Sequence, residues 1–447
     1  MDKEKELSII IYSSSSYLLY DRGGQEISSG EATAQLDEEN LRVLPKLGEA
    51  LLFPFRDIID IVEGDYRIHL TFTSGERLVL FNLGYRYEDF LSALTKLRNE
   101  LLLKDMLMKE TLKKSGIEAE LAYFNEGDKQ IQKGECEVRL YETAIVILPP
   151  KGEPVRIPYS DLSEMREEDH RLVLNTEYAE RIVLSKMGDK YDEVVKILSD
   201  LINALSLKVQ LSLKELLPEA DPSAIRRASR FMKEGRAAKR SDIQSVSPEL
   251  WTELEKKLEG LGIKNEYDFL KSFSQQEKIC IGLKRGLLGD LTREYIWFLI
   301  PIYSVNPAVP GNAVAIEATS EEGEGRATYF FRIVSRKDYP NFRDIGDLHR
   351  WVDTFIRMMN RSMISINFRR EPIYLPDSRL RESQYEKYRF AILKLPALQT
   401  LRSLFIGRVI HSSPEQWRQD VLDLLKFNVS TQNDNAKWQR REQTQSP

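Results

Sequence analysis

Apolar and polar residues alternate along residues 66–72, and in the neighbouring stretch 78–81 Leu78 and Leu80 alternate with Val79 and Phe81. A period of two gives one apolar face and one solvent-facing side, as in an antiparallel strand that covers a core with one face. Thr73-Ser74-Gly75 separates the two stretches, and its glycine allows the backbone angles of a tight turn. We therefore predict a β-hairpin over 66–81.

Short apolar runs precede this hairpin at 41–44, 51–55 and 58–62, and a different pattern follows it. From Tyr87 onward the apolar residues recur at the spacing of a helix with one buried face. The segment is therefore predicted to form six or seven short strands closed by one amphipathic helix. Its first strand is expected to begin near Leu7, with a turn or bulge at the serine run 13–16.

The same pattern occurs a second time. Residues 41–102 align with 145–206 without a gap, and the register extends upstream to Gly23 over Gly127. Because a shared register without gaps is the mark of an internal repeat, we predict two copies of one domain.

The order of features within each copy identifies a related family. A Gly48-Glu49 turn leads into a Leu-Phe-Pro-Phe strand, Asp57-Ile58 enters the next strand, Ser74-Gly75-Glu76 forms the hairpin, and the helix comes last. This order resembles pleckstrin-homology-like (PH-like) domains, including the bacterial and GRAM-type branches, over residues 7–102 and 117–205. The resemblance implies two orthogonal sheets in each copy, with one open corner plugged by the helix, and such domains are mostly binding modules.

Beyond the second copy, mixed elements are expected. Residues 207–218 fit either an added strand or a helix end, and Asp221-Pro222-Ser223 predicts the start of a helix that runs to about Met232. On that helix Ile225, Ala228, Phe231 and Met232 are expected to face inward. Strands are predicted at 278–283, 294–304, 313–318 and 326–334, followed by an amphipathic helix over 348–359 capped by Asp344 or Asp347.

The C-terminal part is predicted to hold an extended arm and several helices. The arm covers 367–380, helices are expected at 382–395 and 398–410, and Ser413 begins a capping box for a last helix. The tail after about Thr431 is rich in Gln, Asn and Arg and is expected to be disordered.

Together these patterns predict an α+β, multi-domain chain: two tandem PH-like β-barrel or sandwich domains, each closed by a C-terminal helix, and then a mixed α/β region with C-terminal helices. The strand-rich unit in that region is either a separate unit or a divergent third PH-like domain. The expected divisions are PH-like domains at 1–104 and 115–206, a helical linker with a basic helix at 207–275, the strand-rich unit at 276–366, the arm and C-terminal helices at 367–430, and the tail at 431–447.

Charge is distributed unevenly over the 447 residues. About 26 basic and 39 acidic residues lie up to Leu205, and about 39 basic and 31 acidic residues lie beyond it. Such asymmetry predicts different partners for the two halves, or one half docking on the other, against the simpler alternative of ordinary solvated surface.

No motif for catalysis, metal binding or cofactor binding is present in the sequence. His69, His170, His349 and His411 stand alone at the sequence level, without a second His, Cys or carboxylate at metal-ligand spacing. There is no P-loop, nucleophile elbow or dinucleotide fingerprint. We therefore expect no enzyme, no cofactor and no metal, against the alternative of an active site that assembles only in three dimensions.

Localisation is predicted from three features of the chain. The longest apolar run, 295–305, contains Pro301 and is shorter than the roughly 20 residues of a membrane span. The N-terminus lacks the apolar core of a signal peptide, and Cys136 and Cys280 form no disulfide framework. A reducing cytoplasm is the expected compartment.

Phosphoinositide-binding members of the PH-like family place several Lys and Arg residues between their first two strands. Here the corresponding loops, 21–25 and 125–129, each carry one basic residue beside at least one acidic residue. This departure disfavours phosphate binding of the family type. Protein binding is the expectation that remains, at the strand edges and in the groove beside each helix.

The expected function is that of a non-enzymatic adaptor or scaffold that binds protein partners. The alternative is a binder of an anionic membrane surface or of nucleic acid through the basic C-terminal half. The candidate contacts are basic residues on one helix face and around the arm: Arg226, Arg227, Arg230, Lys233, Arg369, Arg370, Arg379 and Arg381. A linker helix with a solvated basic face is the simpler alternative for the first four.

Overall fold

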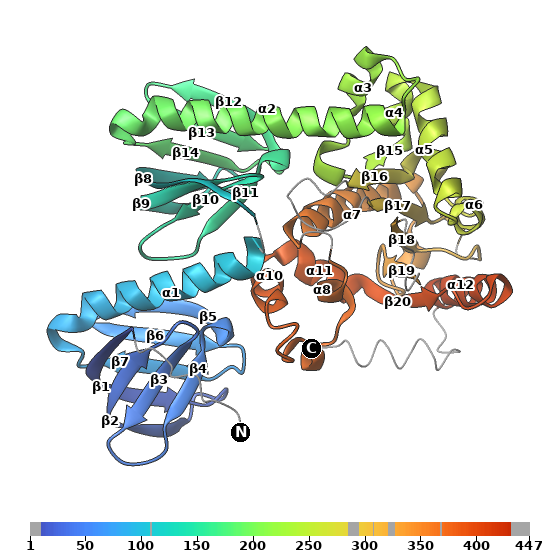
Figure 1. The fold of residues 1–447 in the computed structure, drawn as a ribbon. Coiled ribbons are helices and arrows are strands. Elements are labelled where there is room, and N and C mark those ends of the chain that lie inside the picture. The colour runs from blue at the N-terminus through green and yellow to red at the C-terminus, as the bar shows by residue number, and fades with distance from the viewer. Residues whose placement is uncertain are drawn as a thin grey trace, which may run out of the picture. The chain divides into compact units, whose positions relative to one another are not determined.

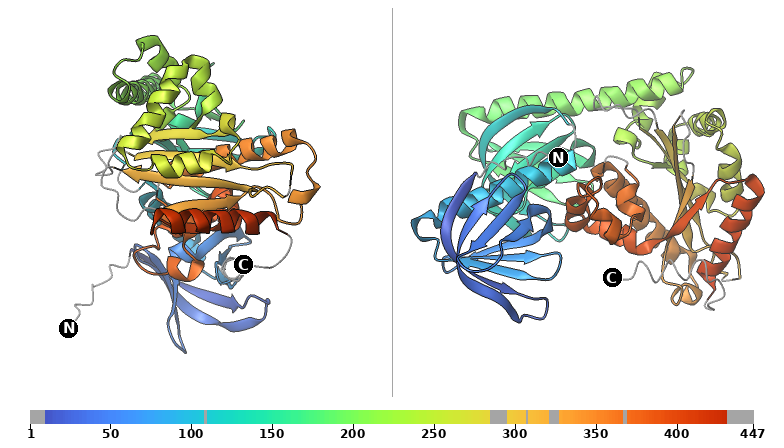
Figure 2. Two further views of the ribbon diagram at one scale, coloured as in Figure 1. Left: turned by 90° about the vertical axis from the view of Figure 1, so that its right-hand side faces the viewer. Right: turned by 60° about the horizontal axis from the view of Figure 1, so that its bottom comes forward.

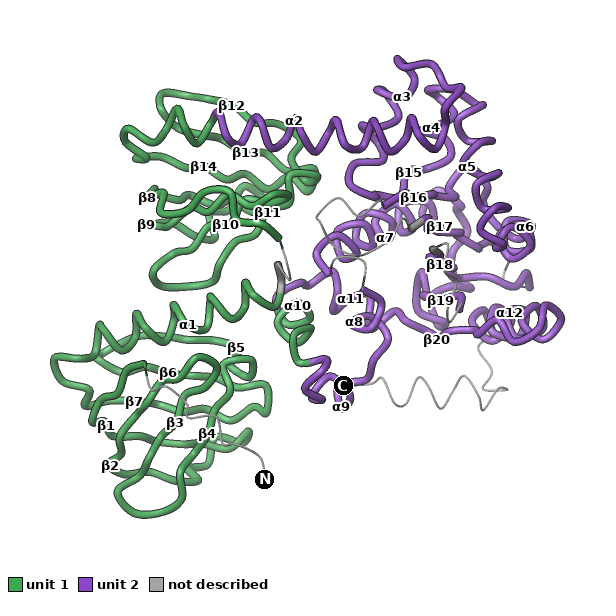
Figure 3. Tube along the Cα trace, in the orientation of Figure 1, with its two compact units in different colours: residues 1–195, 386–393 green, residues 196–385, 394–447 purple. Residues whose placement is uncertain are grey.

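The computed structural model describes residues 10–107, 110–284, 295–306, 308–320, 327–366 and 369–430. The chain forms two compact units, which are coloured separately in Figure 3. Unit 1 comprises residues 1–195 together with Glu386–Leu393, and unit 2 comprises Lys196–Tyr385 and Lys394–Pro447. Each unit is described by itself below.

The first repeat of unit 1 is a seven-stranded antiparallel sheet closed by a helix (Figure 1). Its order is β4-β3-β2-β1-β7-β6-β5. The elements are β1 (Ile11–Tyr20), β2 (Glu26–Leu36), β3 (Asn40–Pro45), β4 (Leu51–Pro54), β5 (Ile58–Gly64), β6 (Arg67–Phe72), β7 (Arg77–Phe81) and α1 (Tyr87–Leu107).

The second repeat has the equivalent strand order, β11-β10-β9-β8-β14-β13-β12. Its elements are β8 (Leu112–Phe124), β9 (Gln130–Tyr141), β10 (Ala144–Leu148), β11 (Val155–Pro158), β12 (Leu162–Glu168), β13 (Arg171–Thr176), β14 (Arg181–Ser185) and α2 (Tyr191–Leu216). Even the turn at Asp65 and Tyr66 has its counterpart, since Asp169 and His170 share its positive φ. The predicted fold class is confirmed.

Two details of unit 1 and its closing helix differ from the sequence predictions or complete them. The serine run does not break the first strand, because β1 continues through it with Ser13 and Ser15 buried. Their hydroxyls donate to the carbonyl groups of Leu83 and Ala32, both at 3.5 Å, so small polar side chains are tolerated inside. The open choice at 207–218 is settled as a helix end, because α2 continues to Leu216.

Unit 2 is built on a six-stranded antiparallel sheet with the order β15-β16-β17-β18-β19-β20. The strands are β15 (Ala238–Lys239), β16 (Cys280–Lys284), β17 (Tyr295–Ile302), β18 (Ala313–Ser320), β19 (Ala327–Arg332) and β20 (Phe405–Ile410). This order does not repeat that of the first two sheets, so it lends no support to the hypothesis of a divergent third copy.

Helices cover both faces of this sheet (Figure 2). One face packs against α3 (Pro222–Ala228), α4 (Arg240–Val246), α5 (Pro248–Gly260), α6 (Lys264–Lys271) and α12 (Pro414–Val429), which share one buried core with β16–β19. The other face meets α7 (Ile345–Ser365), whose Phe355 ring lies 5.7 Å from that of Phe331. The predicted helix start at Asp221 and the cap at Ser413 are confirmed, and Asp344, one of the two candidates, caps α7. Each of these side chains accepts from a backbone N–H of its helix.

Three sequence predictions in unit 2 are wrong. The arm is not extended, because residues after 370 form the short helices α8 (Glu371–Tyr374) and α9 (Asp377–Leu380). The helix predicted at 398–410 divides into α11 (Pro396–Leu404) and β20, since β20 pairs with β19. The basic helix ends at Ala228, and Phe231, expected inside, is 38% exposed. The predicted disordered tail lies outside the described residues.

Two general expectations concern thiols and membrane spans. Cys136 and Cys280 are both free and buried, and burial raises the pKa of the Cys136 thiol to about 12. Within the residues that the structure describes, no helix has the length and apolar character needed to cross a bilayer.

Candidate functional site

The first repeat holds a segment from far along the chain at one corner of its sheet. β4 ends at Pro54, a short turn carries Arg56 and Asp57, and β5 begins at Ile58. The segment Glu386–Leu393, which includes most of α10 (Tyr388–Lys394), belongs to the same compact unit. Arg389 of this segment contacts Asp57, which lies 332 positions earlier.

Phe390 anchors the segment. Its side chain is fully buried and forms part of the hydrophobic core of the first repeat, together with residues of β1–β7 and α1. The guanidinium of Arg98, on α1, lies 5.6 Å from the centre of the Phe390 ring, within the range of a cation–π contact. Because a whole aromatic ring leaves water, this contact is the main apolar contribution to docking.

Arg389 adds directional contacts beside the anchor. Its guanidinium donates to the Asp57 carboxylate and to Thr73 Oγ1 at 3.3 Å, and Thr73 itself donates to Asp57 at 3.0 Å. Burial lowers the pKa of Arg389, and the neighbouring charge of Arg56 lowers it further. The Asp57 carboxylate therefore provides a negative charge beside this half-buried cation.

Arg56 connects the corner to α1 and to the first residue of the docked segment. It donates to both oxygens of Asp105, at 2.8 and 3.1 Å, and it forms ion pairs with Glu39 at 3.1 Å and Glu386 at 3.7 Å. Burial alone would lower its pKa, but Asp105 and Glu39 outweigh that effect and raise the Arg56 pKa. The corner thus places the Arg56 guanidinium and the Asp57 carboxylate close to the segment that carries the buried Phe390 ring.

The second repeat has the same backbone at this corner but different side chains. The Thr73 amide donates to the Asp57 carbonyl at 2.9 Å, and the aligned Glu177 amide donates to the Asp161 carbonyl at 2.8 Å. Ser160 stands where the first repeat has Arg56. The segment-binding chemistry therefore belongs to the first repeat and is not a requirement of the fold.

A turn of the second repeat docks on α1 and β5 of the first. Glu153 forms an ion pair with Arg98 at 3.0 Å, Asn99 Nδ2 donates to the Gly152 carbonyl at 3.0 Å, and Lys151 donates to Glu63 at 2.9 Å. Arg98 also donates to the Ile58 carbonyl at 3.0 Å. This one side chain therefore joins β5, the second repeat and the docked Phe390.

A cavity of about 730 Å³ lies between α1 and the β8–β9 hairpin. Several of its charged side chains already pair with each other. Arg139 donates to Glu100 at 2.7 and 3.0 Å and to Glu137 at 2.8 Å, and Lys186 pairs with Glu120. We interpret this cavity as a polar seam between the repeats.

The basic residues selected from the sequence all lie in unit 2. Arg226, Arg227 and Arg230 are exposed on α3 and just after it, whereas Lys233 is half-buried. Around the arm, Arg379 and Arg381 are exposed and Arg369 and Arg370 are half-buried. Arg370 lies 5.8 Å from the Tyr329 ring, and Arg379 forms an ion pair with Glu382. The role of both groups in binding stays a prediction.

Sequence reasoning missed Arg56, Arg98, Arg389 and Phe390. Residues 389 and 390 fall within a predicted helix, where an Arg-Phe pair has no distinctive pattern. The alignment of the two repeats contained a signal, because Arg56 and Arg98 align with Ser160 and Ile202. Differences of this kind indicate residues that serve a role in one copy and not in the other.

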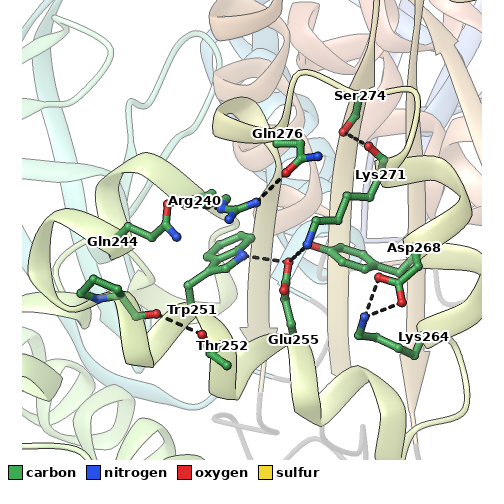
Figure 4. A network of polar contacts seen from close by, with 12 residues as sticks. Arg240, Gln244, Trp251, Thr252, Glu255, Lys264, Asp268, Lys271, Ser274 and Gln276 are labelled. Carbon is green, nitrogen blue, oxygen red and sulfur yellow. Dashed lines mark hydrogen bonds and ion pairs between the residues drawn. The ribbon is translucent and has the colours of Figure 1, made fainter.

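Unit 2 contains a polar network around Glu255 that joins α5 to α6 (Figure 4). One oxygen of Glu255 accepts from Trp251 Nε1 at 2.9 Å, from the Tyr267 hydroxyl at 2.6 Å and from Lys271 at 2.8 Å. Burial alone would raise the Glu255 pKa, but these donors and the Lys271 charge outweigh it and lower the pKa below 4.5. The network fastens two helices together.

We expect the stability of unit 2 to fall in acid partly through Glu255. Since its folded pKa is depressed, its contribution is present above the unfolded pKa and is lost as pH falls through the lower folded value. Glu255→Gln should flatten the decrease in melting temperature below about pH 4.5, the unperturbed carboxyl range. Glu253→Gln, on the exposed side of α5, is the matched control, and an identical acid profile for both variants would contradict this prediction.

Histidines make local polar contacts in unit 2. His411 Nε2 lies 3.3 Å from Glu317 and 3.1 Å from Thr328, and the Tyr303 hydroxyl pairs with His349 Nδ1 at 2.5 Å. Among the described residues, no group of three or more His, Cys, Asp or Glu side chains is arranged to hold a metal ion.

Comparison with known proteins adds little to this description. No protein-family model matches the chain, and no curated protein matches it. A solved structure titled "Structure of the Spt16D Pob3N heterodimer" aligns with 38% of this chain and 85% of that chain, at 13% identity and a TM-score of 0.16. At that level the match says nothing about what this chain does. The strand order of the two repeats and their closing helices agree with the PH-like resemblance expected from the sequence.

Proposed function

We propose that the chain is a non-enzymatic, cytoplasmic adaptor that binds protein partners through its PH-like repeats. One observation carries the proposal: the first repeat binds a short helical segment, inserting its Phe390 ring into the core and pairing its Arg389 with Asp57. A buried aromatic anchor beside a charged pair is the arrangement found at the centre of protein interfaces. Such a corner can take a similar segment from another protein.

The rival proposal is a binder of anionic membranes or nucleic acid. The exposure of Arg226, Arg227 and Arg230 favours it. Binding to a polyanion releases the counterions of that polyanion, so its affinity falls steeply as the salt concentration rises. Docking of an apolar anchor should depend little on the salt concentration. Titration of the full chain with an oligonucleotide and with phosphatidylserine vesicles, at low and physiological salt, separates the two proposals.

The adaptor proposal is tested by weakening the docking of the chain's own segment and adding that segment back as a free peptide. Full-length Phe390→Ala removes the anchor of the chain's own segment, so a labelled peptide with the sequence of residues 384–395 should bind it. The wild-type chain should bind the peptide at least about tenfold more weakly, because its tethered segment competes at high effective concentration. Fluorescence anisotropy measures both affinities.

Two altered peptides serve as controls. Peptides carrying Arg389→Glu or Phe390→Ala should lose most of the affinity, since one reverses the charge opposite Asp57 and the other removes the anchor. Equal binding of all three peptides would refute recognition by this corner.

A further inference from the structure

The outward face of the first repeat's sheet has a central row of three apolar residues and one histidine. Val62 pairs with His69, His69 pairs with Val79, and Val79 pairs with Leu18, so these residues form one row across β5, β6, β7 and β1. Val62 and His69 are exposed at one end of the row. The row lies on the solvent side because the alternate residues, such as Ile68 and Leu80, face the core.

Arginine–aromatic pairs lie on both sides of this row. Arg67 on β6 lies over the Phe81 ring of β7 at 5.3 Å, and Arg77 on β7 lies over the Tyr20 ring of β1 at 5.7 Å. Both contacts are cation–π pairs between strands, which hold each guanidinium against the sheet surface.

A third group of this kind lies at the start of β1. Arg86 is 5.2 Å from the Tyr12 ring and 5.9 Å from the Tyr85 ring. Tyr12 is 56% exposed and Tyr85 is 90% exposed. Two large aromatic rings therefore remain in water beside a guanidinium, which is the side-chain combination enriched at the energetic centres of protein interfaces.

The second repeat keeps one of these pairs, since Arg181 lies 4.0 Å from the Phe124 ring, but it lacks the other aromatic residues, so the fold does not require them. Arg86 Nη1 donates to the Tyr12 carbonyl at 2.7 Å, and the aligned Lys190 Nζ donates to the Gly116 carbonyl at the same distance. The backbone contact is thus kept while the aromatic rings change. Tyr12, Phe81 and Tyr85 align with Gly116, Ser185 and Asp189.

The two repeats also differ in the charge of this face. Ser14 and Ser16 of β1 align with Glu118 and Glu120 of β8. In the second repeat Glu120 pairs with Lys186, and Arg181 pairs with Asp128 at 2.6 Å, so its basic groups are neutralised. The first repeat has serines instead, and its face is locally basic within an acidic half of the chain.

We propose that this arginine–aromatic face, defined by Tyr12, Tyr20, Arg67, Arg77, Phe81 and Arg86, binds an acidic segment of a partner protein that also carries apolar side chains. Carboxylates of the segment pair with the guanidinium groups, and an apolar side chain covers the central row. Charge complementarity selects this partner.

A peptide fits this face better than a polyphosphate or a bilayer. The chain up to Leu205 carries about 39 acidic and 26 basic residues, which repel an extended polyanion. A short peptide meets only the charges within about 8–10 Å, the screening length at physiological salt, and there the face is basic.

The experiment uses the full chain and a labelled peptide of alternating glutamate and leucine, measured by fluorescence anisotropy at physiological salt. Arg67→Ser should weaken binding about tenfold, or about 1.4 kcal/mol. Arg171→Ser, the aligned change in the second repeat, should leave the affinity unchanged. The double change Ser14→Glu and Ser16→Glu gives the first repeat the residues that the second repeat carries at these positions, so this variant should fold normally. It should also lose binding of the peptide, because it adds negative charge to the face.

Three results would overturn the proposal: equal losses from Arg67→Ser and Arg171→Ser, equal binding of an all-glutamate peptide, or face-dependent binding of phosphatidylserine vesicles without binding of the peptide. Circular dichroism of each variant verifies folding. The face shares no residue with the Arg56–Asp57 corner. Ser14→Glu and Ser16→Glu, introduced together into the Phe390→Ala chain, should therefore leave binding of the 384–395 peptide unchanged. The two proposals can thus fail independently of each other.

Discussion

Replacing Phe390 by alanine should destabilise the docking of Glu386–Leu393 on the first repeat by about 3–5 kcal/mol, the range for truncating a fully buried phenylalanine. The reason is the complete burial of the ring among core residues of the first repeat, where the smaller side chain leaves a cavity. Hydrogen exchange followed by mass spectrometry should show faster exchange in residues 386–393, in the turn at 55–57 and in the C-terminal half of α1. Exchange in α7, which belongs to unit 2, should stay the same.

Phe231→Ala is the matched control. The same atoms are removed, but this side chain is 38% exposed and lies in unit 2, so the effect should be much smaller. If hydrogen exchange in the first repeat is the same in the two variants, burial of the Phe390 ring does not stabilise that repeat.

Replacing Arg98 by isoleucine should loosen the junction between the two repeats by about 2–3 kcal/mol. The Arg98 side chain is 1% exposed. Its loss removes a hydrogen bond to the Ile58 carbonyl, the ion pair with Glu153 and the cation–π contact with Phe390. Breaking a buried pair from one side costs about 3–5 kcal/mol, and we reduce that value because Glu153 is 40% exposed. Isoleucine is what the second repeat carries at this position, so the first repeat should still fold.

Calorimetry of the full chain gives the readout for Arg98→Ile. The transition of unit 1 should broaden or split, because the repeats would no longer melt together. Lys151→Ala removes two other ion pairs between the repeats, with Glu63 and Glu88, but Lys151 is about half exposed, so its effect should stay below about 1 kcal/mol. An equal effect of the two changes would show that burial of Arg98 is energetically unimportant.

Much of the fold could be predicted because its elements have clear periods and caps. Alternation located the 66–81 hairpin, the repeat supplied the second domain, and capping residues located the starts of α3, α7 and α12. The failures involve local patterns that tertiary contacts override. Phe405–Ile410 followed a helical stretch, yet it contains Gly407 and β-branched residues and lies at the edge of a sheet whose neighbour, β19, is distant in the sequence.

The candidate site was less predictable than the fold for a physical reason. Clusters of like charge, such as Arg226 to Lys233, are visible in a sequence because their members are neighbours. The Arg56–Asp57 corner works through residues that are far apart, and nothing local distinguishes Phe390 from any other apolar residue on a short helix. Only the differences between the two repeats, such as Arg98 against Ile202, were readable in advance.

The separation of 332 residues between Asp57 and Arg389 has a consequence for synthesis. Translation proceeds at about 5–20 residues per second, so the first repeat leaves the ribosome on the order of tens of seconds before the ring that completes its core. During that interval the newly made repeat lacks the Phe390 ring in its core and the Arg389 charge beside Asp57. A nascent chain stalled before residue 386 would therefore expose a ready binding site for molecular chaperones, which the finished protein closes with its own segment.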